Sequence, residues 1–305
     1  MPSTRCLVVL LALAAATAAP ALPLREDLAE RLAERTRRVD LLPPRTRVAR
    51  DIRYGAHPQQ ALDVYVGDDG PANRPVIVMV HGGGWRGGDK ASPGVVGAKA
   101  ARWVPRGFVL VSVNYRLLPD HGPLAQADDV ARALARVQER AAAWGGDPSR
   151  IVLMGHSSGA HLVALLSADP ARWRLRPWLG TVALDGVAYD LEAQMRERHF
   201  RMYDAAFGSD PATWRAASPS AALKAGAVPL LAVCSRTRRD RPCTYNEAYV
   251  KRIRGLGVRA EVLGAQLDHA GINRELGRLE TYTRAVERFM ASLDAEVARR
   301  LEPAR

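Results

Sequence analysis

Cysteine is scarce in this chain of 305 residues, which contains only Cys6, Cys234 and Cys243. Structural zinc sites need clusters of Cys and His ligands at short spacings, and the sequence contains no such cluster. It also lacks the glycine fingerprint of dinucleotide-binding folds and the Walker loop of nucleotide hydrolases. We therefore expect neither a metal ion nor an organic cofactor.

Long apolar runs are also missing. The apolar stretch Cys6–Ala19 is shorter than the roughly 20 residues that a transmembrane helix needs. It follows Arg5 and leads into the small residues Ala16–Ala21, which is the pattern of a cleaved signal peptide. We predict a signal peptide over residues 1–21, export to the periplasm or the medium, and no membrane span after its removal.

Lysine is rare, with only Lys90, Lys99, Lys224 and Lys251, so the formal net charge of +12 comes almost entirely from arginine. A basic chain can bind nucleic acid or another polyanion. Here the basic residues are scattered, apart from short runs at 35–38 and 236–239. This distribution favours an ordinary solvated surface, and we expect no nucleic-acid partner.

Two cysteines, Cys234 and Cys243, remain once the signal peptide is removed. In an exported protein, two cysteines this close in sequence predict one small disulfide loop. If the chain is not exported, they are two free thiols.

The sequence predicts one α/β domain over residues 47–300. An N-terminal extension, 22–46, precedes it and has a helical pattern. Two strands open the domain, and buried apolar runs such as 76–80 and 108–113 then alternate with helical segments. This alternation predicts a mostly parallel sheet covered by helices on both faces. Residues 190–223 break the alternation and predict a cap-like insertion, and 274–301 predicts one long closing helix.

The most informative motif is Gly-x-Ser-x-Gly at Gly155–Gly159. An apolar, β-branched segment (151–154) precedes it, and an Ala- and Leu-rich helical segment follows. A strand, a tight turn and a helix in this order form a nucleophile elbow, in which the serine hydroxyl is exposed on a strained turn. The alternative is a glycine-rich structural turn. We predict that Ser157 is the nucleophile.

A serine nucleophile needs an oxyanion hole, and a run of three glycines supplies a candidate. Gly82–Gly84 directly follow the buried strand 76–80 and His81. The spacing that follows does not fit a phosphate-binding loop. We predict the amides of Gly83, Gly84 and Ser158 as oxyanion donors. We expect His81 to hold the loop rather than act as a base.

The serine also needs a base, which follows it in the chain on this kind of elbow. His161 lies one helical turn after the serine, and His199 lies in the predicted insertion. His269 lies in the loop between the last strand and the closing helix, where it can reach the elbow. We predict that His269 is the base.

The acid that orients the base has two candidates. Asp240 is the only carboxylate in the loop after strand 228–233, and a disulfide would pin that loop. Asp185 ends the preceding strand and is the alternative acid. Asp268 is adjacent to the base, and we expect it to point elsewhere. We assign Asp240.

Four motifs together resemble the α/β-hydrolase superfamily: His81–Trp85, Asn114–Leu117, Gly145–Ile151 and Gly155–Gly159. The resemblance runs from about residue 48 to 292. It is nearest to the esterase and lipase branch that includes kynurenine formamidase-like and bifunctional feruloyl and acetyl-xylan esterase-like proteins.

The resemblance implies the α/β-hydrolase fold, with an eight-stranded sheet and a small cap. It also implies hydrolysis of small-molecule carboxylic esters through an acyl-enzyme on a Ser-His-Asp triad. In that family the acid closes a His-Gly-x-x-Asp turn after the seventh strand, whereas the matching turn here, Cys234–Arg238, ends in arginine. The alternatives are an arylformamidase or another amide hydrolase, and a non-catalytic binding protein on the same fold.

Overall fold

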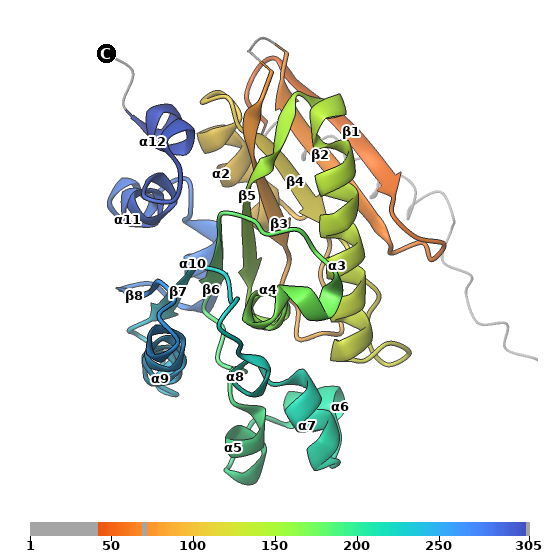
Figure 1. Ribbon diagram of the computed structural model, residues 1–305, viewed down its shortest axis with the longest axis vertical. Helices are drawn as coiled ribbons and strands as arrows, with labels where there is room; N and C mark the ends of the chain where they lie inside the picture. The colour runs from red at the N-terminus through yellow and green to blue at the C-terminus, as the bar shows by residue number, and fades with distance from the viewer. Residues whose placement is uncertain (1–41, 69–71, 303–305) are drawn as a thin grey trace, which may run out of the picture.

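One eight-stranded sheet forms the centre of the molecule, with the strand order β1-β2-β4-β3-β5-β6-β7-β8 (Figure 1). The computed structural model describes residues 42–68 and 72–302. Only β2 runs antiparallel to its neighbours, and all pairs from β4 to β8 are parallel. This confirms the predicted mostly parallel sheet. The strands are β1 (Thr46–Arg53), β2 (Ala61–Gly67), β3 (Arg74–Val80), β4 (Val109–Val113), β5 (Gly146–His156), β6 (Gly180–Leu184), β7 (Leu230–Ser235) and β8 (Ala260–Ala265).

Helices cover both faces of the sheet, because the central strands are apolar on both sides. All seven residues of β3 are buried, and successive side chains contribute to different core clusters. One face packs against α3 (Pro123–Arg140), α4 (Ser158–Ala168) and α9 (Pro242–Gly255). The other packs against α2 (Pro93–Trp103), α11 (Glu280–Ala291) and α12 (Ala295–Leu301). Two short 3-10 helices, Ala141–Trp144 and Pro170–Trp173, follow α3 and α4.

Four short helices lie between β6 and β7, beyond one end of the sheet (Figure 1). They are α5 (Leu191–Arg196), α6 (Arg201–Phe207), α7 (Pro211–Ala217) and α8 (Pro219–Ala222). His161 of α4 donates a hydrogen bond from Nε2 to the carbonyl of Ala217, over 2.8 Å, and so ties α7 to the elbow helix. These helices stand over the carboxyl ends of the parallel strands, the edge where α/β sheets place their sites.

The prediction of one long helix over 274–301 is wrong. The segment contains two helices, α11 and α12, and its first residue ends the preceding α10 (His269–Arg274). Gly277 interrupts it with a φ of +101°, at a place where a Cβ would lie 2.4 Å from the carbonyl oxygen of Ala98. Asp294 then starts α12 by accepting from the amides of Glu296 and Val297. The predicted signal peptide, 1–21, and most of the extension lie outside the described residues.

Candidate active site

Ser157 lies on the tight turn between β5 and α4, with φ 55° and ψ −118°. The flanking glycines are required by close backbone approach. A Cβ on Gly155 would lie 2.3 Å from the carbonyl oxygen of Gly159, and a Cβ on Gly159 would lie 2.5 Å from those of Val80 and His81. The sequence therefore forms the strained strand-turn-helix geometry that exposes a serine hydroxyl.

Three side chains from separate loops form one hydrogen-bonded chain. The imidazole of His269, at the start of α10, lies with Nε2 3.0 Å from Ser157 Oγ. Its Nδ1 lies 2.6 Å from Oδ2 of Asp185, which directly follows β6. An imidazole whose Nδ1–H is held by a carboxylate presents an unprotonated Nε2 to the serine hydroxyl. The arrangement can therefore take the proton from Ser157 Oγ.

Asp185 is almost completely buried, with 1% of its surface exposed. Its other carboxylate oxygen accepts a hydrogen bond from the amide of Ser235 over 2.8 Å. Burial by itself raises the pKa of Asp185, but the hydrogen bonds from His269 and Arg238 and the positive charge of Arg238 outweigh it. The net result is a pKa below the ordinary value, so Asp185 is ionised at neutral pH.

The structure corrects the assignment of Asp240 as the acid beside the base. Asp240 lies in the loop after β7, but its two carboxylate oxygens accept from Nε and Nη2 of Arg238. The carboxylate in contact with His269 is Asp185, the alternative candidate. Asp268 caps α10 by accepting from the amide of Gly271 and so points elsewhere, as expected.

Two neighbours of His269 were missed by sequence reasoning. His156, within the Gly-x-Ser-x-Gly motif, donates from Nε2 to the carbonyl of His269 over 2.9 Å, and the two rings lie 4.6 Å apart. Burial, and then the neighbouring His269, lower the pKa of His156 to about 3. Arg238 is the other neighbour, with Nη1 at 3.1 Å from His269 Nδ1. An arginine at the position where the resembling family has its acid was the feature of the sequence that could have identified this neighbour.

The glycine loop after β3 lies against the elbow. Gly83 and Gly84 have φ values of +135° and +60°, which favour glycine. His81 is buried and stacks on Tyr115 at 4.5 Å, and its carbonyl accepts from the hydroxyl of Tyr115. The side chain of His81 thus packs beneath the loop, and burial lowers its pKa.

The Cys234–Cys243 disulfide is present, which confirms that prediction. It joins the end of β7 to the start of α9 and closes the loop that carries Arg238 and Asp240. The disulfide therefore limits how far these two side chains can move away from Asp185.

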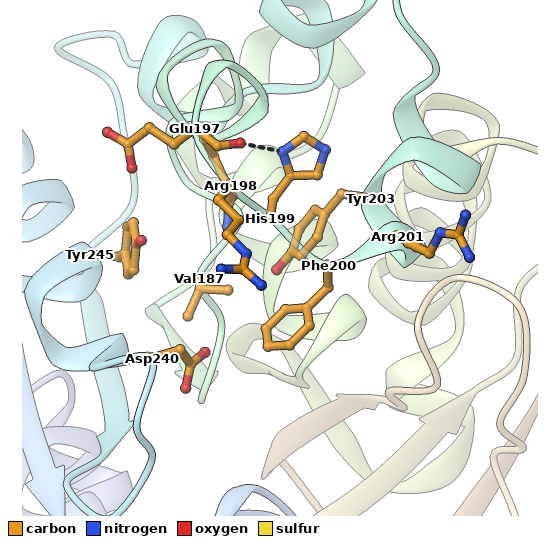
Figure 2. Close-up of a pocket in the computed structure, with 10 residues that line it drawn as sticks. Val187, Glu197, Arg198, His199, Phe200, Arg201, Tyr203, Asp240 and Tyr245 are labelled. Carbon is orange, nitrogen blue, oxygen red and sulfur yellow. Dashed lines mark hydrogen bonds between the residues drawn. The ribbon is translucent and has the colours of Figure 1, made fainter.

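Two neighbouring pockets surround the serine. An inner cavity of about 190 Å³ contains Ser157, Asp185, Arg238 and His269 in its lining, together with apolar and aromatic side chains. An outer pocket of about 400 Å³ shares Val187, Phe200 and Tyr203 with it. Figure 2 shows the outer pocket, with the guanidinium of Arg198 pointing toward Val187 and Asp240. The shared residues show that the two pockets lie side by side.

Among residues 42–68 and 72–302, no group of three or more His, Cys, Asp or Glu side chains is arranged to hold a metal ion. No helix within the same ranges has the length and hydropathy to cross a membrane.

Comparison with known proteins identifies esterases as relatives. The BD-FAE family model matches residues 62–197. A probable isoprenylcysteine alpha-carbonyl methylesterase of Arabidopsis thaliana is 37% identical over 38% of this chain and 27% of that protein. Esterase LipC of Mycobacterium tuberculosis is 29% identical over 73% of this chain and 59% of that protein. Among eight of the curated relatives that it matches, this chain spans between 24% and 59% of their lengths.

A solved structure with the same architecture is esterase B of Lactobacillus rhamnosis. It superimposes with a TM-score of 0.68 at 19% identity, over 90% of this chain and 94% of that one. Similarity at this level of identity establishes the fold. The sheet order and this structural similarity together show that the chain has the α/β-hydrolase fold.

Proposed function

We propose that this chain is a serine hydrolase of carboxylic esters, with Ser157 as nucleophile, His269 as base and Asp185 as the acid. The hydrogen-bonded chain from Asp185 through His269 to Ser157 carries the proposal. A serine hydroxyl is a weak nucleophile unless an oriented base takes its proton, and this is the arrangement required. The esterase names of the relatives support an ester as the substrate.

The reaction follows the two-step course of acyl transfer. Ser157 Oγ attacks the ester carbonyl carbon while its proton passes to His269 Nε2. As the tetrahedral intermediate collapses, the bond to the alkoxy oxygen breaks and His269 returns the proton to the departing alcohol. A water molecule, deprotonated by His269, then attacks the acyl-enzyme and releases the carboxylic acid. Asp185 stays ionised and holds Nδ1 of the imidazole throughout.

The amides of Gly83, Gly84 and Ser158 are the proposed oxyanion donors. The amides of Gly83 and Gly84 donate to no acceptor within the described ranges. Ser158 is the first residue of α4, and the first amides of a helix have no intrahelical acceptor. Donors held in place before the reaction stabilise the developing negative charge without reorganisation.

The size of the inner cavity supports a short acyl group. At about 190 Å³ it is smaller than the roughly 300–1,000 Å³ of pockets that hold drug-sized ligands. We expect p-nitrophenyl acetate and butyrate to be hydrolysed with higher kcat/KM than p-nitrophenyl laurate. The cleavage of formamides uses the same machinery, but nothing in the site favours it over ester cleavage.

A fluorophosphonate probe tests the proposal directly. We expect it to label the wild-type protein and not Ser157→Ala, and p-nitrophenyl acetate turnover to fall by at least about 10³-fold in that variant. A folded wild-type protein that neither takes the label nor hydrolyses any ester of the panel would exclude a hydrolase.

Export to an oxidising compartment is also a proposal. The disulfide supports it, and N-terminal sequencing of the protein recovered from its source tests it.

A further inference from the structure

We propose that Arg238 is a positioning residue of this site, whose guanidinium holds the Asp185 carboxylate against His269 and is balanced in charge by Asp240. The inference rests on the proposed function. Arg238 stands where the resembling family has its acid, and here the acid comes from the neighbouring strand end instead. A positively charged side chain thus occupies the vacated position.

The contacts of Arg238 link three functional side chains. Its Nη1 donates to Asp185 Oδ2 over 2.6 Å, the same oxygen that accepts from His269 Nδ1. On its other side the guanidinium donates from Nε to Asp240 Oδ1 over 2.9 Å and from Nη2 to Oδ2. Asp185 therefore has fixed donors on both oxygens, since Ser235 donates to Oδ1. The carboxylate cannot rotate away from His269 without breaking at least one of these bonds.

Burial strengthens the electrostatic interaction between Arg238 and Asp185. The side chain of Arg238 is 19% exposed and that of Asp185 is fully buried, so solvent screens their interaction weakly. Removing one partner of such a pair leaves a buried charge without compensation. The pair Arg238–Asp240 adds no net charge beside the imidazole, although each member alone would.

The charges around His269 come from several elements. His156 packs on its ring from the end of β5 and is held neutral by burial. Lys99 of α2 donates to the carbonyl of Asn273, at the far end of α10. The remaining groups are Asp185 after β6, Arg238 and Asp240 after β7, and Asp268 on the cap of α10. Among these, only Arg238 and Asp185 contact the Nδ1 side of the ring.

Charge variants separate a positioning role from a merely structural one. Arg238→Met leaves Asp240 as an extra negative charge beside the site, so the acid limb of the kcat/KM profile should move to higher pH. Asp240→Asn leaves the positive charge of Arg238 unbalanced and moves the acid limb of the kcat/KM profile to lower pH. The two profiles should move in opposite directions, by several tenths of a pH unit to one unit, on p-nitrophenyl acetate.

Kinetic constants and rescue give a second readout. We expect Arg238→Met to lower kcat by about 10- to 100-fold with little change in KM. Arg238→Lys should restore part of kcat, and guanidinium chloride at millimolar concentration should restore part of the activity of Arg238→Gly. Arg239→Met, a change at the exposed neighbour, is the matched control and should match the wild type.

A wild-type pH profile in Arg238→Met, or a shift in the same direction in both charge variants, would overturn the proposal. So would a loss of kcat that neither lysine nor guanidinium relieves in a variant with wild-type circular dichroism and thermal unfolding. The proposed function would fail on a different result, in which the wild-type protein itself hydrolyses no ester.

A second, independent observation concerns the outer pocket, and from it we infer that the substrate carries a carboxylate away from the scissile bond. Arg198 points its guanidinium into this pocket, while the carboxylate of Glu197 points away from it (Figure 2). Of the other charged groups of the lining, Asp240 pairs with Arg238 and His199 pairs with Asp204. Arg201 adds a second positive charge to the lining and points away from Arg198 (Figure 2). The charge that faces a substrate there is therefore positive.

The surroundings of Arg198 suit an organic acid rather than a bare anion. Phe200 and Tyr203 line both pockets, and Tyr245 faces Arg198 across the outer one (Figure 2). These aromatic rings offer a contact surface to the apolar part of an organic acid, while the guanidinium can pair with its carboxylate. The inference rests on the proposed function and names the substrate class of that site.

Matched pairs of esters test this inference, with the carboxylate on the alcohol part in one pair and on the acyl part in the other. The first pair is 4-acetoxybenzoate and 4-acetoxybenzamide; the second is the p-nitrophenyl monoesters of glutarate and glutaramate. In at least one pair we expect KM to be about tenfold lower for the carboxylate, an advantage that Arg198→Gln removes and Arg196→Gln keeps. Equal KM values within both pairs, or an advantage that survives Arg198→Gln, would overturn the inference. Hydrolysis of neutral p-nitrophenyl acetate in the same assays tests the proposed function separately.

Discussion

His269 Nδ1 and Asp185 Oδ2 lie 2.6 Å apart, although 84 residues separate them in the chain. Asp185 follows β6, the strand beside the elbow strand β5, and has a φ of +52°, a conformation that is strained for a residue with a Cβ. Its amide donates to the carbonyl of Val233 on β7. The backbone is therefore held at this point by its neighbours, which directs the carboxylate toward His269.

The two candidate acids differ sharply in expected effect. Asp185→Asn removes the charge that stabilises the imidazolium and favours the wrong tautomer of His269, so kcat should fall by about 10³- to 10⁴-fold. Asp240→Asn removes a contact that reaches the base only through Arg238, and kcat should fall by no more than about tenfold. Steady-state rates on p-nitrophenyl acetate measure both, and the reverse order of effects would restore Asp240 as the acid.

The elbow glycines should be intolerant of a methyl group. Gly159→Ala would place a Cβ 2.5 Å from two carbonyl oxygens, so the free energy of unfolding should fall by about 1–3 kcal/mol and ester turnover should drop as the turn shifts. Gly94→Ala in α2 is the matched control, because a Cβ there meets no atom within 4 Å. It should be neutral or stabilising by up to about 1 kcal/mol. Urea unfolding compares the two, and similar losses of stability would contradict the argument.

The disulfide should stabilise the fold and the site together. Cys234 and Cys243 are nine residues apart, and closing a loop of this size contributes about 2–3 kcal/mol through the unfolded chain. Replacing both with alanine should lower the midpoint of thermal unfolding, and kcat should also fall because Arg238 and Asp240 are less restrained. Dithiothreitol added to the wild type should reproduce both changes and leave the double variant unaffected.

Lys99 should make stability depend on pH. It is fully buried, and its Nζ donates to the carbonyl of Asn273 over 2.7 Å. Burial lowers its pKa from 10.5 to about 7. Between these values the unfolded chain binds more protons than the folded one, so the free energy of unfolding from this group rises with pH across that window and is lowest below pH 7.

Replacement of Lys99 by methionine tests this dependence. The variant should gain stability over the wild type at about pH 6, and the difference should shrink toward about pH 10. Thermal unfolding across this range measures it, with Lys224→Met, at an exposed lysine, as the control. Parallel curves for Lys99→Met and the wild type would show that Lys99 does not titrate in this window.

Local patterns in the sequence were enough to predict the sheet, the elbow and the histidine that lies beside Ser157. Continuous apolar runs such as 76–80 identify strands buried on both faces, and the glycines around Ser157 identify a turn that admits no side chains. The closing segment was predicted wrongly because its apolar periodicity continues past Gly277, where a positive φ and the backbone at Ala98 end the regular course. Periodicity records which face is apolar, and contacts across the fold decide where a helix stops.

The sequence by itself determined that a serine, a glycine loop and a late histidine follow strands whose carboxyl ends share one edge. Only the tertiary structure decided which aspartate meets that histidine. Both β6 and β7 end at this edge, so spacing allows either Asp185 or Asp240, and the sequence analysis chose Asp240. The choice depends on directions of side chains that no local pattern encodes: Arg238 engages Asp240, while Asp185 is turned toward His269.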